Sequence, residues 1–380
     1  MIHKLTAIEF TSSGLRLLSG YELNGKLYVE ASIETGPLCL GADGYVEKDS
    51  AVKVLSEALL QLKQKISGIG GLILLVPPVG FGVKNESYST ATSSPDAVIS
   101  LQDYHNCTSM MEKDVYIPLK TVVYEAPVTF GTDNQKGLDA FPLRVSSRRF
   151  DLNADVHFVE EDMLKHYQNL LREAGVKPYL TIVSSYAGIS LMNTYPDAPD
   201  NYLSLVIEGK YTYFSEVSSH RLVSSEVIPF GSRNLINAAS KVLGLSEERT
   251  AELLQTYGFM KESRFVYRTD EDLSLTDLYT AFDKGLDNLV LRLGSILKEK
   301  NPSLPIIFYG PKVNLRGLPG LLSERLFRSV IVFQSQVIGA RSQSLNHLLG
   351  AIHLGSLPYQ MPQYNDSAEN DEAQYQGFHR

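Results

Sequence analysis

One order of elements occurs twice along this 380-residue chain and constrains its fold more than any single motif. In the first copy, three alternating segments are expected to form consecutive strands, and Asn24-Gly25 between two of them is typical of a hairpin. Apolar residues then recur at helical spacing over residues 52–66, and an uncharged strand over residues 72–76 stops at a pair of prolines. The three expected strands cover residues 5–10, 15–18 and 26–33.

The second copy begins near Tyr202 and has the same order of strands, helices and strand. Its expected strands cover residues 203–207, 211–217, 221–228, 305–309 and 330–333. Helical patterns fill residues 233–300 and include a long amphipathic helix over residues 278–297. The repeated order predicts an α/β protein made of two duplicated domains.

Residues 80–160 differ in character from both copies and are expected to form a small α+β insert. Strand-like segments in it are separated by polar loops and lie around Tyr88 and over residues 115–117, 121–124 and 155–159. A helix over residues 160–174, a strand over 179–183 and a helix from residue 187 return the chain to the first domain.

The composition excludes several classes of protein. A net charge of −8 argues against a nucleic-acid-binding protein, and two cysteines, Cys39 and Cys107, cannot build a disulfide framework. No signal peptide is expected at the N-terminus. Residues 66–83 carry no charge, but their glycines and Pro77-Pro78 exclude a spanning helix. We expect a cytoplasmic protein.

Residues 358–380 are expected to be a disordered acidic tail. The stretch 365–372 contains four acidic residues and no basic one. A membrane-surface helix needs an apolar face and cationic residues, and this stretch has neither. No direct membrane anchor is therefore expected, and any place at the inner face of a membrane would be reached through a partner.

Several short motifs occur in a consistent order. They lie at residues 7–16, 141–144, 149–157, 170–176, 227–235, 251–258, 315–321 and 345–352. In this order they resemble the actin-like ATPase superfamily, most closely the branch of the bacterial cell-division protein FtsA, with the pilus protein PilM as its relative. The resemblance covers about residues 5–355. It implies duplicated actin-like (ribonuclease H-like) domains with a small α+β insert of the 1C type.

The resemblance also implies domain boundaries. Subdomain 1A would comprise residues 1–79 and 161–200, the 1C-like insert 80–160, subdomain 2A residues 201–235 and 303–357 with the return helix, and the helical subdomain 2B residues 236–302.

Two hairpins would hold the phosphates of ATP with Mg²⁺ in such a fold, because glycine lets backbone N–H groups approach a phosphate closely. The candidate cofactor-binding residues are Glu9, Thr11, Ser12, Ser13, Gly14, Gly209, Thr212, Gly231, Glu252, Gln255, Gly310 and Asn314. No catalytic and no metal-binding residue is assigned.

The second hairpin departs from the family pattern. Val206 and Tyr213 replace its two aspartates, and Glu208 would lie where phosphates need neutral or positive surroundings, with Lys210 offsetting part of its charge. Pro311 removes a backbone donor on the adenosine side, and Gln255 replaces the usual lysine. ATP binding is expected to be weak at most, and efficient hydrolysis is not expected.

Three histidines, His157, His220 and His347, lie singly on expected elements. Because no second ligand accompanies any of them, we expect them to be partly exposed structural residues.

The resemblance favours an FtsA-like scaffold that works in cell division through protein–protein contacts. It implies a tubulin-like FtsZ partner and self-association through residues 80–160. Two alternatives remain: an active ATPase that uses Glu9 and Glu208 as substitute carboxylates, and a PilM-like adaptor that binds a short peptide in a groove between subdomains 1A and 1C.

Overall fold

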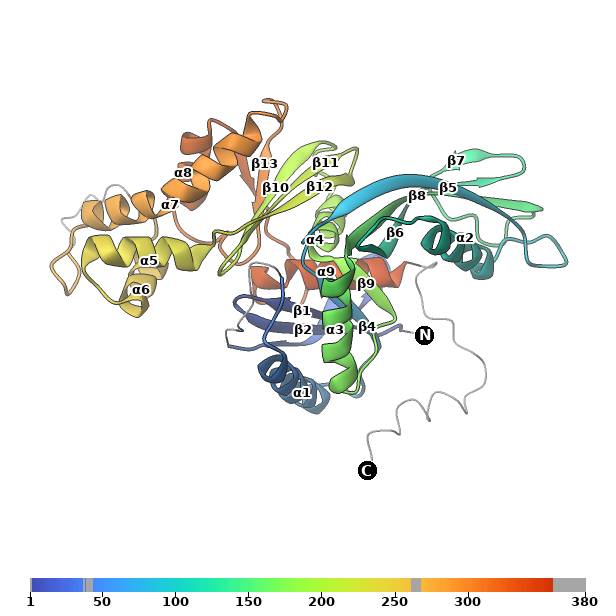
Figure 1. The fold of residues 1–380 in the computed structure, drawn as a ribbon, viewed down its shortest axis with the longest axis horizontal. Coiled ribbons are helices and arrows are strands. Elements are labelled where there is room, and N and C mark those ends of the chain that lie inside the picture. Colours follow the sequence, from blue (N-terminus) through green and yellow to red (C-terminus); the bar gives the residue numbers. More distant parts are fainter. Residues whose placement is uncertain (1, 37, 39–43, 261–267, 358–380) are drawn as a thin grey trace.

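A computed structural model describes residues 2–36, 38, 44–260 and 268–357 (Figure 1). The tail expected to be disordered, residues 358–380, lies outside the described residues. No helix within the described ranges is long and apolar enough to cross a bilayer.

The first half is built on a five-stranded sheet with the order β3-β2-β1-β4-β9. The first three strands form an antiparallel meander, and β4 and β9 add to it in parallel. These strands are β1 (Leu5–Thr11), β2 (Gly14–Leu23), β3 (Lys26–Glu34), β4 (Gly71–Val76) and β9 (Leu180–Val183). Its helices are α1 (Lys48–Lys65), α3 (Glu161–Glu173), α4 (Ser184–Asn193) and α9 (Asn346–Ser356), the last preceded by a short 3₁₀ turn, Gln343–Leu345.

The second half repeats this topology in the order β12-β11-β10-β13-β14, again with an antiparallel meander followed by parallel strands. Its strands are β10 (Tyr202–Ile207), β11 (Thr212–Ser218), β12 (Arg221–Ile228), β13 (Ile306–Tyr309) and β14 (Val330–Val332). Its helices are α5 (Ser232–Leu243), α6 (Glu247–Tyr257), α7 (Leu275–Leu297) and α8 (Leu318–Leu326). The duplicated α/β architecture predicted from the repeated order is confirmed, while the domain boundaries stay a prediction.

A third sheet, in the order β5-β8-β6-β7, lies apart from the other two (Figure 1). It comprises β5 (Gly82–Ala91), β6 (Lys120–Thr132), β7 (Lys136–Leu138) and β8 (Arg149–Glu160), with α2 (Leu101–Asp114) against one face. The strand expected over residues 115–117 is wrong, because the chain turns at Pro118 and Leu119, where φ is 63°. The helix α2 was not located from the sequence.

Alternation along the strands decides which side chains face the middle of the molecule. Ile8 and Phe10 of β1 pack with α1 and α3, whereas Leu5 and Ala7 pack with α4 and α9. Glu9 follows the parity of Leu5 and Ala7, so its carboxylate points toward α4 and α9. The strand thus places a charged residue inside the protein.

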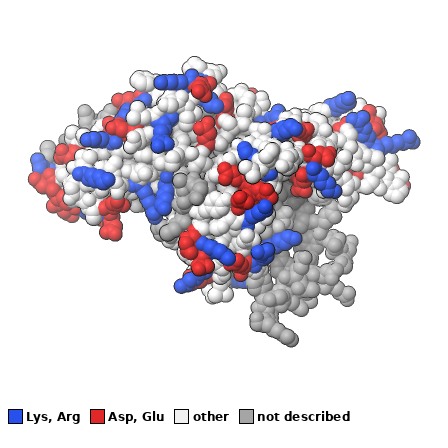
Figure 2. Space-filling view, in the orientation of Figure 1, with Lys and Arg blue, Asp and Glu red and all other residues white. Residues whose placement is uncertain are grey.

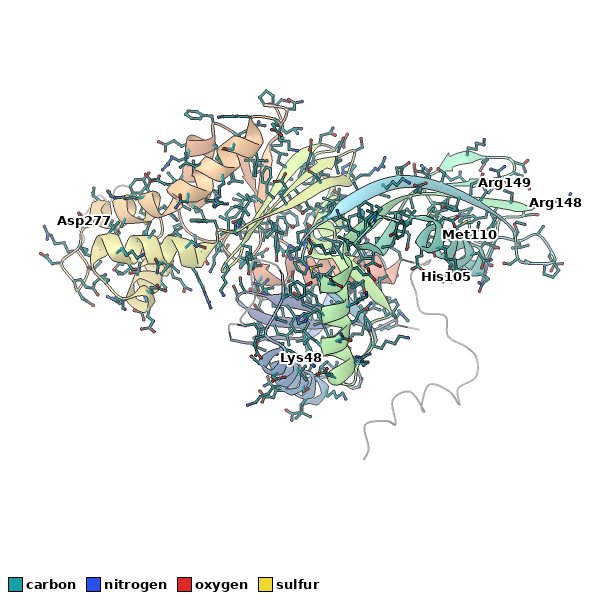
Figure 3. The ribbon with its side chains drawn as sticks, viewed as in Figure 1. Lys48, His105, Met110, Arg148, Arg149 and Asp277 are labelled. Atoms are coloured by element: carbon teal, nitrogen blue, oxygen red, sulfur yellow. The ribbon has the colours of Figure 1, made fainter. Side chains whose placement is uncertain are left out.

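The helices α4 and α9 lie against each other between the first and second sheets. Gly350 of α9 permits this contact, since a Cβ there would lie 1.7 Å from the Ala187 carbonyl oxygen. The third sheet is tied to the second half by Arg221, whose Nε donates to Asp155 Oδ2 at 2.6 Å. Figure 3 shows how far the molecule extends, with Arg148 and Arg149 at one extremity and Asp277 at the other.

Candidate functional site

Where the two halves meet, Arg16 of β2 pairs with Glu208, which follows the end of β10. The Arg16 guanidinium donates two hydrogen bonds to Glu208, Nη1 to Oε1 at 2.8 Å and Nη2 to Oε2 at 3.0 Å. Arg16 is 3% exposed and Glu208 1% exposed. A bidentate pair of this kind fixes geometry as well as charge. It therefore fastens the meander of the first sheet to the meander of the second.

A second buried carboxylate, Glu9 of β1, joins the same cluster. Its Oε1 lies 2.7 Å from His347 Nδ1 on α9, and its Oε2 lies 3.5 Å from Arg16 Nη1. The other ring nitrogen of His347 lies 3.2 Å from the Tyr309 hydroxyl on β13. Burial alone would raise the pKa of Glu9, but His347 and Arg16 outweigh it and hold that pKa below its ordinary value. Glu9 is thus kept ionised in the interior.

We call Glu9, Arg16, Glu208 and His347 the ionic cluster. Its members come from β1, β2, the end of β10 and α9, so it draws on both halves of the molecule. Each of its carboxylates already has a partner, the Arg16 guanidinium for Glu208 and the His347 imidazole for Glu9. Within the described residues, no group of three or more His, Cys, Asp or Glu is arranged to hold a metal.

The tips of the two hairpins touch each other directly. The Lys210 backbone N–H donates to Ser12 Oγ at 2.9 Å. A Cβ on Gly209 would lie 2.9 Å from Ser12 Oγ and 3.1 Å from Ser13 Oγ, and one on Gly231 would lie 2.6 Å from the Glu208 carbonyl oxygen. These glycines therefore permit close approach of protein to protein.

Other predicted residues stabilise the hairpins from within. Thr11 Oγ1 donates to the Gly14 carbonyl at 2.8 Å, and Thr212 Oγ1 donates to the Phe230 carbonyl at 2.8 Å. Both threonines are buried, so their hydroxyl groups are committed to the backbone.

The remaining predicted residues lie outside this cluster. Glu252 is exposed on α6 and pairs with Arg249, and Gln255 is exposed one turn later. Asn314 is exposed and accepts a hydrogen bond from Gln334 at 2.7 Å. Gly310 has φ 89° and follows β13. The nucleotide-binding role of all twelve candidates stays a prediction.

The expectation that the three histidines are partly exposed is wrong for two of them. His347 and His157 are fully buried rather than partly exposed, and only His220 of the three histidines has an exposed ring. The side chain that pairs directly with Glu208 is Arg16, while the expected contribution of Lys210 stays a prediction. A signal for Arg16 was present, because it is the one charged residue within the apolar strand segment Leu15-Arg16-Leu17-Leu18. No comparable signal singles out His347.

No family model matches the chain, and no curated protein matches it significantly. Solved structures do resemble it. A PilM–PilN type IV pilus biogenesis complex matches with a TM-score of 0.59 at 19% identity, over 93% of this chain and 99% of that one. The ethanolamine utilization protein EutJ from Carboxydothermus hydrogenoformans matches with a TM-score of 0.54 at 11% identity, over 92% and 89% of the two chains.

A third similar structure is MreB5 of Spiroplasma citri bound to ADP. It matches with a TM-score of 0.54 at 10% identity, over 93% of this chain and 96% of that one. All three identities are low, so the likeness concerns the fold. The chain has the duplicated actin-like ATPase fold.

Proposed function

We propose that this protein is an actin-like scaffold that works by binding other proteins and does not turn over ATP. The observation that carries the proposal is the ionic cluster. Arg16 and Glu208 pair with each other where the two hairpins meet. A hydrogen bond from the Lys210 backbone to Ser12 joins the hairpin tips. In this superfamily the corresponding hairpins would separate around the phosphates of a nucleotide.

The fold by itself does not exclude a nucleotide, since the similar MreB5 structure is bound to ADP. The residues of this chain are what argue against one. A phosphate chain entering between the hairpins would have to break the Arg16–Glu208 pair and approach two carboxylates. Glu9 and Glu208 as substitute Mg²⁺ ligands would each have to leave a bonded partner, which disfavours the active-ATPase alternative.

A phosphate-release assay with Mg-ATP tests this part of the proposal. The purified chain is expected to release phosphate no faster than a Glu9→Gln variant, because neither has a free carboxylate to organise Mg²⁺ and water. A wild-type rate well above that of Glu9→Gln would show turnover that depends on this carboxylate and would refute the proposal.

For the partner, we propose an adaptor role in a cell-envelope machine, at the inner face of the membrane through a bound partner. The chain resembles the PilM–PilN complex in fold over almost its full length. The loop between α2 and β6 offers a contact surface where the third sheet meets the first half. Tyr116 and Leu119 are 82% and 83% exposed there, and the Leu119 carbonyl accepts from the backbone N–H of Glu161 at the start of α3.

Exposed apolar side chains at such a junction suit the docking of a short peptide. An FtsA-like role in division, with an FtsZ-type partner and self-association through residues 80–160, is the second candidate, and it rests on the order of motifs alone. The two candidate functions differ in the protein that the chain binds.

Co-purification separates the two candidates. The tagged chain is challenged in parallel with a PilN-type protein and an FtsZ-type tubulin homologue from the same genome. We expect retention of the first and not of the second. The Tyr116→Ser/Leu119→Ser variant should no longer retain the PilN-type protein.

The matched control is Phe327→Ser/Leu60→Ser, which removes an exposed aromatic ring and an exposed leucine elsewhere on the molecule and should retain the partner. Retention of the FtsZ-type protein alone would favour the division role, and equal loss in both variants would refute the docking surface.

A further inference from the structure

A groove of about 750 Å³ runs along one face of α5 in the second half. Arg233, Asn237 and Lys241 lie four residues apart on this helix and so share that face. Lys210, at the tip of the second hairpin, lines the same groove. Figure 2 shows Lys and Arg side chains gathered beside the end of α5 that faces the first half.

The charge in the groove is strongly positive for an acidic protein. The groove is lined by three basic residues, Lys210, Arg233 and Lys241, and by one acidic residue, Glu247. The Glu247 carboxylate accepts a hydrogen bond from Asn237 Nδ2. Neither Arg233 nor Lys241 forms an ion pair with a described carboxylate, whereas nearby Arg249 holds several. Such a surface attracts an anionic ligand.

The layout of the groove fits a peptide better than a single phosphate group. Arg233 and Lys241 are eight positions apart on a helix, which separates them by about 12 Å. Asn234, Asn237 and Asn288 add amide groups that both donate and accept, as a peptide backbone requires. The rings of Tyr211 and Phe230 line it as well. A segment with several spaced carboxylates would meet all these groups.

The chain itself contains such a segment. Residues 365–372 carry four carboxylates and no cation, and three of the four, at positions 366, 369 and 372, recur every third residue. A polyproline II segment presents every third side chain on the same side, spaced by about 9 Å. We propose that the α5 groove binds the acidic segment 365–372 of the same copy of this chain.

Fluorescence anisotropy with a labelled peptide of residues 362–376 tests this. The receptor is the full chain with its own segment neutralised by Asp366→Asn, Glu369→Gln, Asp371→Asn and Glu372→Gln. We expect saturable binding that weakens with salt. Adding Arg233→Ala and Lys241→Ala should weaken it roughly tenfold, as two lost ion pairs would.

The matched control removes Lys113 and Arg148, an exposed lysine and an exposed arginine on the insert, by substitution with alanine, and should leave the affinity unchanged. The wild-type chain should bind the peptide more weakly than the neutralised chain, because its own segment competes.

Two results with altered peptides would overturn the proposal: a peptide whose acids are replaced by amides, or a scrambled peptide of the same composition, binds as tightly as the native peptide. Two results with altered receptors would do the same: the Arg233 and Lys241 substitutions leave the affinity unchanged, or the wild-type and neutralised chains bind the peptide equally tightly. Displacement of the peptide by inorganic phosphate alone at low concentration would assign the groove to a small anion and overturn it too.

Discussion

Substitution of Arg16 by methionine should destabilise the protein far more than the loss of an ordinary ion pair. Methionine keeps a long side chain but removes the guanidinium that serves Glu208 at 2.8 and 3.0 Å and lies 3.5 Å from Glu9. Both carboxylates are 1% exposed; Glu9 would keep its contact with His347, and Glu208 would lose both hydrogen bonds from Arg16. Breaking a buried pair in this way costs about 3–5 kcal/mol.

Protonation limits this loss and gives it a characteristic pH dependence. A carboxyl group with an ordinary pKa of 4.5 can accept a proton instead of staying charged in the interior. At pH 7 that costs about 3.4 kcal/mol, and at pH 5 only about 0.7 kcal/mol, because each pKa unit corresponds to about 1.36 kcal/mol. The destabilisation by Arg16→Met should therefore shrink markedly as the pH falls from 7 to 5.

Thermal unfolding followed by circular dichroism measures the effect. A loss of about 3–5 kcal/mol should lower the Tm of the affected half by about 10 °C or more at pH 7. The double variant Arg16→Met/Glu208→Gln should recover at least half of this, since one orphaned carboxylate is removed. The matched control is Arg249→Met, which should change the Tm little because its ion pairs with Glu252 and Glu271 lie at the surface.

A Tm change for Arg16→Met no larger than that of Arg249→Met would refute this reasoning. So would a double variant as unstable as the single one, or a destabilisation that is the same at pH 5 and pH 7. Each result would mean that the Arg16–Glu208 pair does not hold the two halves together.

Further predictions concern packing and buried acids. Gly350→Ala should cost about 1–3 kcal/mol in urea unfolding because its Cβ meets the Ala187 carbonyl at 1.7 Å, whereas Gly294→Ala, with nothing within 4 Å, should stabilise by about 0.5–1 kcal/mol. Burial, with a contribution from Glu112, raises the pKa of Glu125 to about 8, so this acid is neutral when folded and ionises near pH 4.5 when unfolded. Stability should then fall between pH 4.5 and 8, and Glu125→Gln should abolish that fall in urea midpoints measured across this range. Burial lowers the pKa of His157 to about 4, so stability should decline as the pH drops from 6.5 to 4, and His157→Leu should remove that decline in the same measurement.

The duplicated architecture could be predicted because its signals are local. Alternation, hairpin turns and helical spacing lie within short windows, and the order of these windows is itself the topology. The helix α2 was not predicted, although Tyr104, Cys107 and Met111 have helical spacing. Its signal was available in the sequence.

The ionic cluster could not be predicted in the same way. Arg16 lies 192 positions from Glu208, and Glu9 lies 338 positions from His347. Only the fold brings these residues together, and no local pattern says which charged residue will face which. The sequence indicated that the second hairpin departs from the phosphate-binding pattern, and the structure shows direct contacts between the two hairpins.

The most direct test of the proposed loss of nucleotide binding is isothermal titration of the wild-type chain with Mg-ATP. Opening the Arg16–Glu208 pair costs about 3–5 kcal/mol, which would weaken a site from about micromolar to about millimolar affinity. No saturable heat should therefore appear at submillimolar nucleotide. Saturable binding at micromolar Mg-ATP would contradict the claim that protein contacts have replaced the nucleotide.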